Sequence, residues 1–272
     1  LQDAAQNRLR LGNDLRIALN AGQFEINYQP IVDLKTNMID KAEALLRWEH
    51  PVRGTVNPLE FIPLAENTGL IHQLGDWVFK ESARNTAQWR NTFDHMFQVT
   101  VNISPVQFRT ERKTFTREWQ RYLEELELSG ENIIVEITEG LLLNVDDEVI
   151  QKLLWLRDTG IQVAIDDFGT GYSSLSYLKK FDIDYLKIDR SFVHNLNIDD
   201  NNIALSEAII VMAHKLGLKV IAEGVETEQQ KKMLIDAGCD YAQGYLFSRP
   251  LPADELEAIL HKQHNVQHRL FK

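Results

Sequence analysis

Carboxylate, amide and lysine side chains recur where strand-like segments of this sequence end. The residues concerned are Glu43, Asn102, Glu136, Asp166, Asp167, Lys187, Asp189, Glu223, Glu226 and Gln243. Each alone would be explained as a helix cap or a solvated loop residue. Glu136 differs, because it stands between Val135 and Ile137 in an apolar run where an unpaired charge is costly. The repetition of this pattern over successive strand ends therefore favours a shared site.

Five of these residues are acids that a common site would bring together. They are Glu43, Glu136, Asp166, Asp167 and Glu223. Close carboxylates cannot all stay ionised without compensation, and Lys187 offsets only one charge. Divalent cations would supply the rest, because oxygen ligands suit Mg2+, Mn2+ or Ca2+. Two such ions, about 3.5–4 Å apart, activate water and stabilise the leaving oxygen when a phosphate ester is hydrolysed, and this is the chemistry we expect.

Short apolar runs alternate with helical patterns along most of the chain. We predict strands at Gln98–Asn102, Ile133–Ile137, Gln162–Asp166, Tyr185–Ile188, Lys219–Ala222 and Tyr241–Tyr245. We predict helices at Ile71–Trp89, Arg112–Glu125, Asp146–Thr159, Ser174–Lys180, Asn202–Leu216 and Glu228–Ala237. Continuous runs of β-branched residues are typical of parallel strands that are buried on both faces.

The first fifty residues follow a different pattern. Apolar residues recur at helical spacing between 11 and 19, and Gly22 ends this helix. The strand-like segments Phe24–Tyr28 and Ile39–Leu46 follow, and the connection between them is too short for a parallel crossover. We therefore expect residues 1–22 to form a connector helix and residues 23–272 to form one domain that opens with a hairpin.

Eight strands that mostly alternate with helices predict a TIM-like (β/α)8 barrel with one antiparallel strand near the N-terminus. An open doubly wound sheet is the alternative. In a barrel, the C-terminal ends of the strands open onto one face, so polar residues between 43 and 243 would converge there.

Composition excludes several classes of protein. The 272 residues are 44% hydrophobic and 25% charged, which is typical of a folded domain and excludes a disordered chain or a membrane-spanning bundle. A single cysteine excludes an internal disulfide framework and favours a reducing, cytoplasmic setting. With 29 basic and 40 acidic residues, the net charge of -11 argues against a nucleic acid polymer as partner.

Some apparent motifs have ordinary explanations. Asp167-Phe168-Gly169 matches the metal-binding triplet of protein kinases, but the chain has no other kinase motif. The segment 169–174 is similar to a dinucleotide-binding fingerprint but lacks its third glycine. The histidines His261, His264 and His268 have no acidic partners at strand ends, so we expect a solvated tail.

Longer motifs carry a resemblance to a known family. They are Tyr28-Gln29-Pro30-Ile31, Glu43-Ala44-Leu45-Leu46-Arg47-Trp48, Phe61-Ile62-Pro63-Leu64-Ala65-Glu66, Val101-Asn102-Ile103-Ser104, Glu136-Ile137-Thr138-Glu139, Asp166-Asp167-Phe168-Gly169-Thr170-Gly171-Tyr172-Ser173-Ser174-Leu175, Leu186-Lys187-Ile188-Asp189, Ala222-Glu223-Gly224-Val225-Glu226 and Gln243-Gly244-Tyr245. The chain from about residue 11 to residue 260 resembles the EAL domain, a bacterial cyclic di-GMP phosphodiesterase. That family has a TIM-like barrel with one antiparallel strand.

The resemblance implies a metal-dependent catalytic centre. Glu43, Asn102, Glu136 and Asp166 resemble ligands of a first metal ion, and the resemblance implies that Asp166 would also reach a second, with Asp167 and Glu223 beside it. Lys187 and Glu223 would border the attacking water, and either one could act as the general base. Asp189 would hold a water molecule at the metal site. Mg2+ or Mn2+ would support hydrolysis to the linear 5′-pGpG, and Ca2+, which is larger and binds with looser geometry, would inhibit it.

The resemblance also implies how substrate and regulation would be arranged. Residues expected to line the nucleotide are Gln29, Arg47, Glu226, Gln243 and Tyr245. Glu139 would anchor a regulatory and dimerisation loop formed by Asp167, Phe168, Gly169, Thr170, Gly171, Tyr172 and Ser173. Some EAL domains are catalytically silent cyclic di-GMP receptors, but every ligand position is filled here, which favours an enzyme. We expect a homodimer in the cytoplasm, with a sensor domain or membrane anchor elsewhere in a longer protein.

Overall fold

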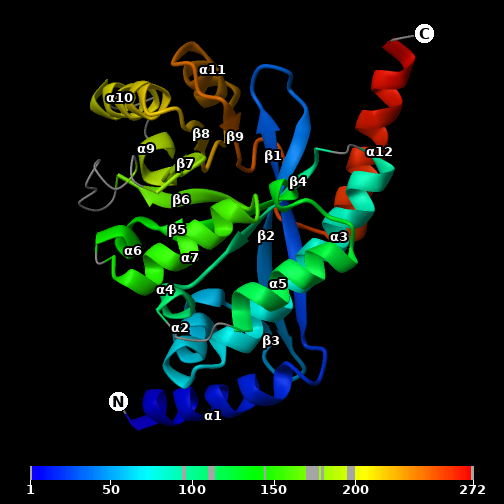
Figure 1. The fold of residues 1–272 in the computed structure, drawn as a ribbon, viewed down its shortest axis with the longest axis vertical. Helices are drawn as coiled ribbons and strands as arrows, with labels where there is room; N and C mark the ends of the chain where they lie inside the picture. The colour runs from blue at the N-terminus through cyan, green and yellow to red at the C-terminus, as the bar shows by residue number, and fades with distance from the viewer. Residues whose placement is uncertain are drawn as a thin grey trace.

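The computed structural model describes residues 2–93, 96–109, 114–143, 145–169, 178, 181–194 and 200–270. Eight strands form a closed barrel (Figure 1). They are β1 (Phe24–Asp33), β2 (Ile39–His50), β4 (Gln98–Asn102), β5 (Ile133–Thr138), β6 (Gln162–Phe168), β7 (Tyr185–Ile188), β8 (Lys219–Ala222) and β9 (Tyr241–Ala242). The short strands β3 (Gly54–Val56) and β10 (Leu251–Pro252) pair with β2 and β1 beside this barrel.

Strand directions confirm the predicted architecture. The strands from β2 round to β9 pair in parallel, whereas β1 is antiparallel to both β2 and β9. The pairing of β1 with β2 closes the barrel. The short turn after β1 allows only a hairpin there, as the sequence predicted, and the open doubly wound alternative was wrong.

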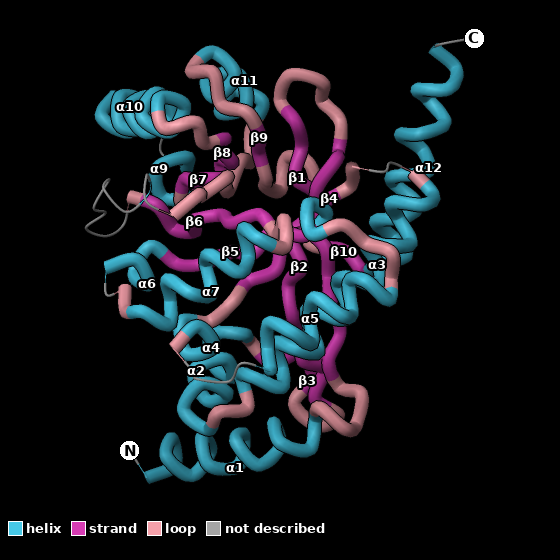
Figure 2. Tube along the Cα trace, viewed as in Figure 1, coloured by secondary structure: helices cyan, strands magenta, loops and turns pink. Residues whose placement is uncertain are grey.

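Helices surround this barrel (Figures 1 and 2). Those described are α1 (Gln2–Ala18), α2 (Pro58–Thr68), α3 (Ile71–Thr92), α4 (Pro105–Phe108), α5 (Thr114–Glu125), α6 (Glu139–Leu143), α7 (Asp147–Asp158), α9 (Arg190–His194), α10 (Asp200–Lys215), α11 (Glu228–Asp236) and α12 (Ala253–Leu270). Within the described ranges, no helix is long and apolar enough to cross a membrane.

The two-residue period of the strands decides which side chains enter the barrel. On β5, Ile133, Val135 and Ile137 pack outward among the core residues beneath the helices, while Ile134 joins an inner apolar layer. Glu136 therefore points into the barrel, two residues above Ile134. The inner layer is formed by Ile31, Ile134, Ala164, Tyr185, Ile221 and Tyr241. This apolar layer separates the polar side chains at the N-terminal ends of the strands from the polar side chains at their C-terminal ends.

The first helix packs against the hairpin side of the barrel. Leu11, Leu15 and Ala18 on α1 share an apolar cluster with Phe24, Trp48 and other residues. Asp14 lies 3.4 Å from His50 Nε2 on β2. These contacts join α1 to the barrel, and its role as a connector stays a prediction.

Three local predictions need comment. The last barrel strand ends at Ala242, not Tyr245, because Gly244 abuts the Val225 backbone and the chain turns there. The C-terminal histidines were expected in a solvated tail, and this was wrong, because they lie on α12, which packs on the barrel near β1 and β10, with the centre of the His261 ring 4.5 Å from the centre of the Phe93 ring. The predicted helix at 174–180 falls outside the described residues, apart from Leu178.

Candidate active site

Lys187 lies at the centre of four carboxylates at the C-terminal end of the barrel. Its Nζ is 2.7 Å from Glu136 Oε1, 2.6 Å from Glu223 Oε1, 3.4 Å from Asp166 Oδ1 and 3.6 Å from Glu43 Oε2. These five residues come from β2, β5, β6, β7 and the residue after β8. Their convergence follows from the strand register, since Thr138 pairs with Asp166, and Lys187 with Ile221.

One ammonium group cannot balance four carboxylates, and the pKa values reflect this. Burial raises the pKa of Glu136 well above its usual range, and the neighbouring charge of Glu43 adds to the effect. Burial also raises the pKa of Glu223, to about 7. Burial alone would lower the pKa of Lys187, but the charges of Glu136 and Glu223 raise it well above its usual range. The site therefore has an excess of negative charge that further cations would relieve.

Glu43 is held by two amides. Asn102 Nδ2 donates to Glu43 Oε1 at 2.8 Å, and Gln243 Nε2 donates to Glu43 Oε2 at 2.6 Å. Gln243 Nε2 also lies 2.9 Å from Gln29 Oε1, and Gln29 donates to the carbonyl of Ser248. Although burial alone would raise the pKa of Glu43, the charge of Lys187 and these amides lower it. Glu43 is thus fixed as an anion.

The donor set fits divalent metal ions. Carboxylate oxygens of Asp166, Asp167 and Glu223 lie within 4.8 Å of one another. Glu136 Oε2 is buried and has no hydrogen-bond partner in the described part of the chain. Oxygen ligands and spare negative charge are the properties that hard divalent cations require.

Asp167 and Asp189 lie beside this group. Asp167 has a positive φ of 55°, and burial, followed by the charge of Asp166, raises the pKa of its carboxyl. Asp189 interacts with Asp167 and accepts a hydrogen bond from Ser191 N at 2.9 Å. Asp189 therefore also helps to begin α9.

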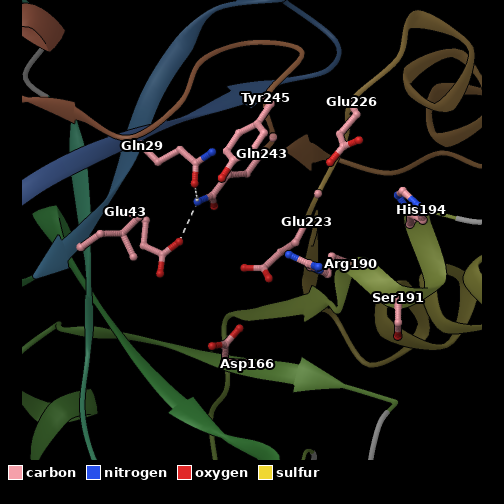
Figure 3. Close-up of a pocket in the computed structure, with 13 residues that line it drawn as sticks. Gln29, Glu43, Asp166, Arg190, Ser191, His194, Glu223, Glu226, Gln243 and Tyr245 are labelled. Atoms are coloured by element: carbon pink, nitrogen blue, oxygen red, sulfur yellow. Dashed lines mark hydrogen bonds between the residues drawn. The ribbon is translucent and has the colours of Figure 1, made fainter. Parts of the chain in front are cut away.

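A cavity of about 500 Å³ opens above the acidic group, and we call it the main cavity because it lies over these acids (Figure 3). Glu43, Gln29 and Gln243 lie on one side, Asp166 and Glu223 border its base, and Glu226 and His194 lie across from Glu43 (Figure 3). Lys187 lies beneath this surface, since it is only 1% exposed. The cavity wall thus carries acids and amides where the strands end.

Glu139 contacts the chain where the predicted regulatory loop begins, and its role as a loop anchor stays a prediction. Its Oε2 accepts a hydrogen bond from Gly169 N at 3.2 Å. Gly169 has a φ of 98° and lies against Phe192, so a side chain at this position would meet that ring. The predicted loop residues Thr170, Gly171, Tyr172 and Ser173 lie outside the described residues.

Two predicted substrate residues take distinct positions. Tyr245 lines the main cavity, is 53% exposed and lies under the guanidinium of Arg249 at 4.2 Å. Arg47 instead lines a neighbouring, largely apolar cavity of about 320 Å³ that Asn102 also borders, and it donates to the carbonyl of Leu46.

The sequence analysis missed Arg190, Ser191 and His194, which line the main cavity from α9. Their signal was available, because they directly follow the strand end that carries Lys187 and Asp189.

Comparison with known proteins gives consistent matches. The family model for the EAL domain matches residues 12–250. Cyclic di-GMP phosphodiesterase NbdA of Pseudomonas aeruginosa is 41% identical over 256 residues, which cover 94% of this chain and 32% of that protein. Probable cyclic di-GMP phosphodiesterase PdeN of Escherichia coli is 36% identical over 260 residues, covering 96% of this chain and 50% of that protein. The chain thus spans about a third to a half of these relatives.

A solved structure shows the same fold. The PaMucR phosphodiesterase in complex with c-di-GMP is 40% identical, with a TM-score of 0.85, and the match covers 91% of this chain and 99% of that one. The family match extends over most of the chain, and the barrel agrees with the fold of this solved structure. This chain therefore belongs to the EAL domain family.

Proposed function

We propose that this domain is a metal-dependent phosphodiesterase that hydrolyses one phosphodiester bond of cyclic di-GMP to give the linear 5′-pGpG. Relatives that carry this activity in their names support the substrate. The observation that carries the reaction class is the convergence of Glu43, Glu136, Asp166 and Glu223 on one lysine. This excess of carboxylates suits divalent cations and would otherwise repel a phosphate ester.

Residues proposed to hold the metal ions are Glu43, Asn102, Glu136, Asp166 and Asp167, with Asp189 and Glu223 beside them. Two bound Mg2+ or Mn2+ ions would supply charge for the phosphate and make water more acidic. The carboxylates of this chain would orient those ions, and the amides of Asn102 and Gln243 keep Glu43 in place. Ca2+, which accepts looser geometry, would bind and inhibit.

Glu223 and Lys187 take different parts in moving the proton. The Glu223 side chain is 20% exposed and lines the cavity, so it can accept a proton from water there. Lys187 is buried beneath and enclosed by carboxylates, so it remains a cation that holds them together. We therefore assign Glu223 as the general base and Lys187 as a charge stabiliser.

A turnover assay tests this function. Cyclic di-GMP is incubated with the protein in Mn2+, and the linear dinucleotide is measured by chromatography. We expect Asp166→Asn and Glu43→Ala to lower the rate at least 100-fold. Asp40→Asn is the matched control, because Asp40 lies at the opposite end of the barrel. Wild-type rate in either site variant would refute the assignment.

Calorimetry separates the enzyme from a receptor. Tight binding of cyclic di-GMP with no product in excess Mn2+ would show a catalytically silent receptor. Displacement by other cyclic nucleotides at equal affinity would show that the substrate class is wrong.

Regulation and location are proposed from the family. We propose a homodimer, in which the segment beyond Gly169 takes part, within a longer cytoplasmic signalling protein. Analytical ultracentrifugation at high protein and ligand concentration tests the dimer, and sedimentation of monomer alone would contradict it.

A further inference from the structure

Arg190 is the one lysine or arginine that lines the main cavity in the part of the chain that the structure describes. The acids around it in the lining are Glu43, Asp166, Glu223 and Glu226, and the titratable residues His194 and Tyr245 line the cavity as well. A dinucleotide with two phosphates brings two negative charges into this cavity. The metal ions would neutralise the ester that is cut, so the second phosphate needs another cation.

The backbone fixes where the Arg190 side chain begins. Arg190 is the first residue of α9, three residues after Lys187. Gly224 lies against it with a φ of 70°, and a Cβ added to Gly224 would be 2.5 Å from Arg190 Cβ. Glu223 N donates to the carbonyl of Ile188 at 3.1 Å, which joins the two segments. The stem of Arg190 is thus placed next to the segment that carries Glu223.

The guanidinium of Arg190 is available to a ligand. Arg190 is an exposed residue, and no hydrogen bond or ion pair to another described residue holds its side chain. Figure 3 shows Arg190 extending from α9 toward the space that Glu223 and Glu43 also border. The acids Glu43, Glu136, Asp166 and Glu223 pair with Lys187 and form no ion pair with Arg190, so the charge of Arg190 is not taken up by this acidic group. A guanidinium can donate two parallel hydrogen bonds to phosphate oxygens.

We propose that Arg190 binds the phosphate of the cyclic dinucleotide that is not cut, and so selects a substrate with two phosphates over a simple phosphodiester. This inference rests on the proposed function. It assigns Arg190 to binding and not to the chemical step.

The experiment compares two substrates in Mn2+, cyclic di-GMP and bis(p-nitrophenyl) phosphate, which has a single phosphate. Arg190→Ala is expected to raise KM for cyclic di-GMP about tenfold, with kcat within about twofold, because a charge-assisted hydrogen bond is lost. Its kcat/KM for bis(p-nitrophenyl) phosphate stays at the wild-type value. Arg190→Lys recovers part of the affinity. Arg121→Ala is the control, because it removes the same charge from the exposed surface of α5, and its kinetic constants for both substrates should stay at the wild-type values.

Two results would overturn the inference. An equal loss on both substrates would place Arg190 at the ester that is cut, and an unchanged KM for cyclic di-GMP would show no contact. Should wild-type protein fail to cleave cyclic di-GMP, the proposed function fails, and calorimetry with cyclic di-GMP in Ca2+ still tests Arg190. If wild type and Arg190→Ala bind cyclic di-GMP with equal affinity in Ca2+, the proposed phosphate contact of Arg190 is refuted.

Discussion

The two ends of the barrel each bury a lysine, in opposite electrostatic settings. Lys187 at the C-terminal end has four carboxylates within 3.6 Å of its Nζ. Lys41 at the N-terminal end is 3% exposed and has one, with Asp40 Oδ2 at 3.1 Å. Its Nζ also lies 4.1 Å from the centre of the Tyr241 ring. Burial lowers the pKa of Lys41, whereas the surrounding acids raise that of Lys187.

The same strands supply both ends. Lys41 and Glu43 are two residues apart on β2, and Tyr185 and Lys187 are two apart on β7. At the N-terminal end, Lys41 is paired with Asp40, and neutral groups meet one another, as where Tyr185 OH contacts Gln98 Oε1 at 3.2 Å. At the C-terminal end, like charges are crowded. This difference leaves the C-terminal end with an excess of negative charge that added cations would relieve.

Replacing each lysine by methionine should give the largest difference in activity between the two ends of the barrel. Lys187→Met leaves four carboxylates without their shared cation, so we expect kcat for cyclic di-GMP to fall at least 100-fold. Lys41→Met should keep kcat within about twofold. Circular dichroism of both variants confirms that the barrel is folded, and equal losses in the two would remove the distinction between the ends.

Metal ions should bind at the C-terminal end of the barrel only, among the acids around Lys187. Chelation with EDTA is expected to abolish turnover and lower the melting temperature, because the carboxylates around Lys187 then repel one another. Restoring Mn2+ should reverse both changes. A melting temperature that is insensitive to Mn2+ would contradict a metal site among these acids. The Asp40→Asn variant should respond to Mn2+ as the wild type does.

Glu223 should make the stability of the metal-free protein depend on pH. The pKa of Glu223 is about 7 in the fold, above the usual 4.5. Between these values the folded state binds more protons than the unfolded chain, so the stability of metal-free protein should decrease as pH rises toward 7. We expect the melting temperature in EDTA to fall by a few degrees between pH 5 and 8, as measured by calorimetry. Glu223→Gln should reduce this change of melting temperature with pH. If the change stays as in the wild type, other groups than Glu223 cause it.

The smallest effect is expected at the N-terminal end. Tyr241→Phe removes the hydroxyl that Lys219 Nζ contacts at 3.4 Å but keeps the ring beside Lys41. We expect the free energy of unfolding to change by less than about 1 kcal/mol, with kcat unaffected. Urea denaturation measures the first quantity. A large loss of activity would mean that the two ends are coupled.

Much of the fold was predictable because it depends on local pattern. The short connection after Asp33 required a hairpin, and the β-branched runs indicated parallel strands. The last strand was predicted too long because Gly244 meets Val225, a contact between segments that are distant in sequence. Likewise, α2 and the extension of β2 to His50 depend on packing against α1 and gave no strong periodic signal.

Residue types and motifs were enough to identify the side chains that could do chemistry, because acids, amides and one lysine stand at strand ends in the chain. The folded barrel was needed to show that Lys187 lies among all four acids, that Arg47 lines a separate cavity and that Arg190 faces the main one. The physical reason is that side-chain type and spacing are local properties. The meeting of β2, β5, β6, β7 and β8 side chains depends instead on barrel closure and register, which arise from pairing between distant strands.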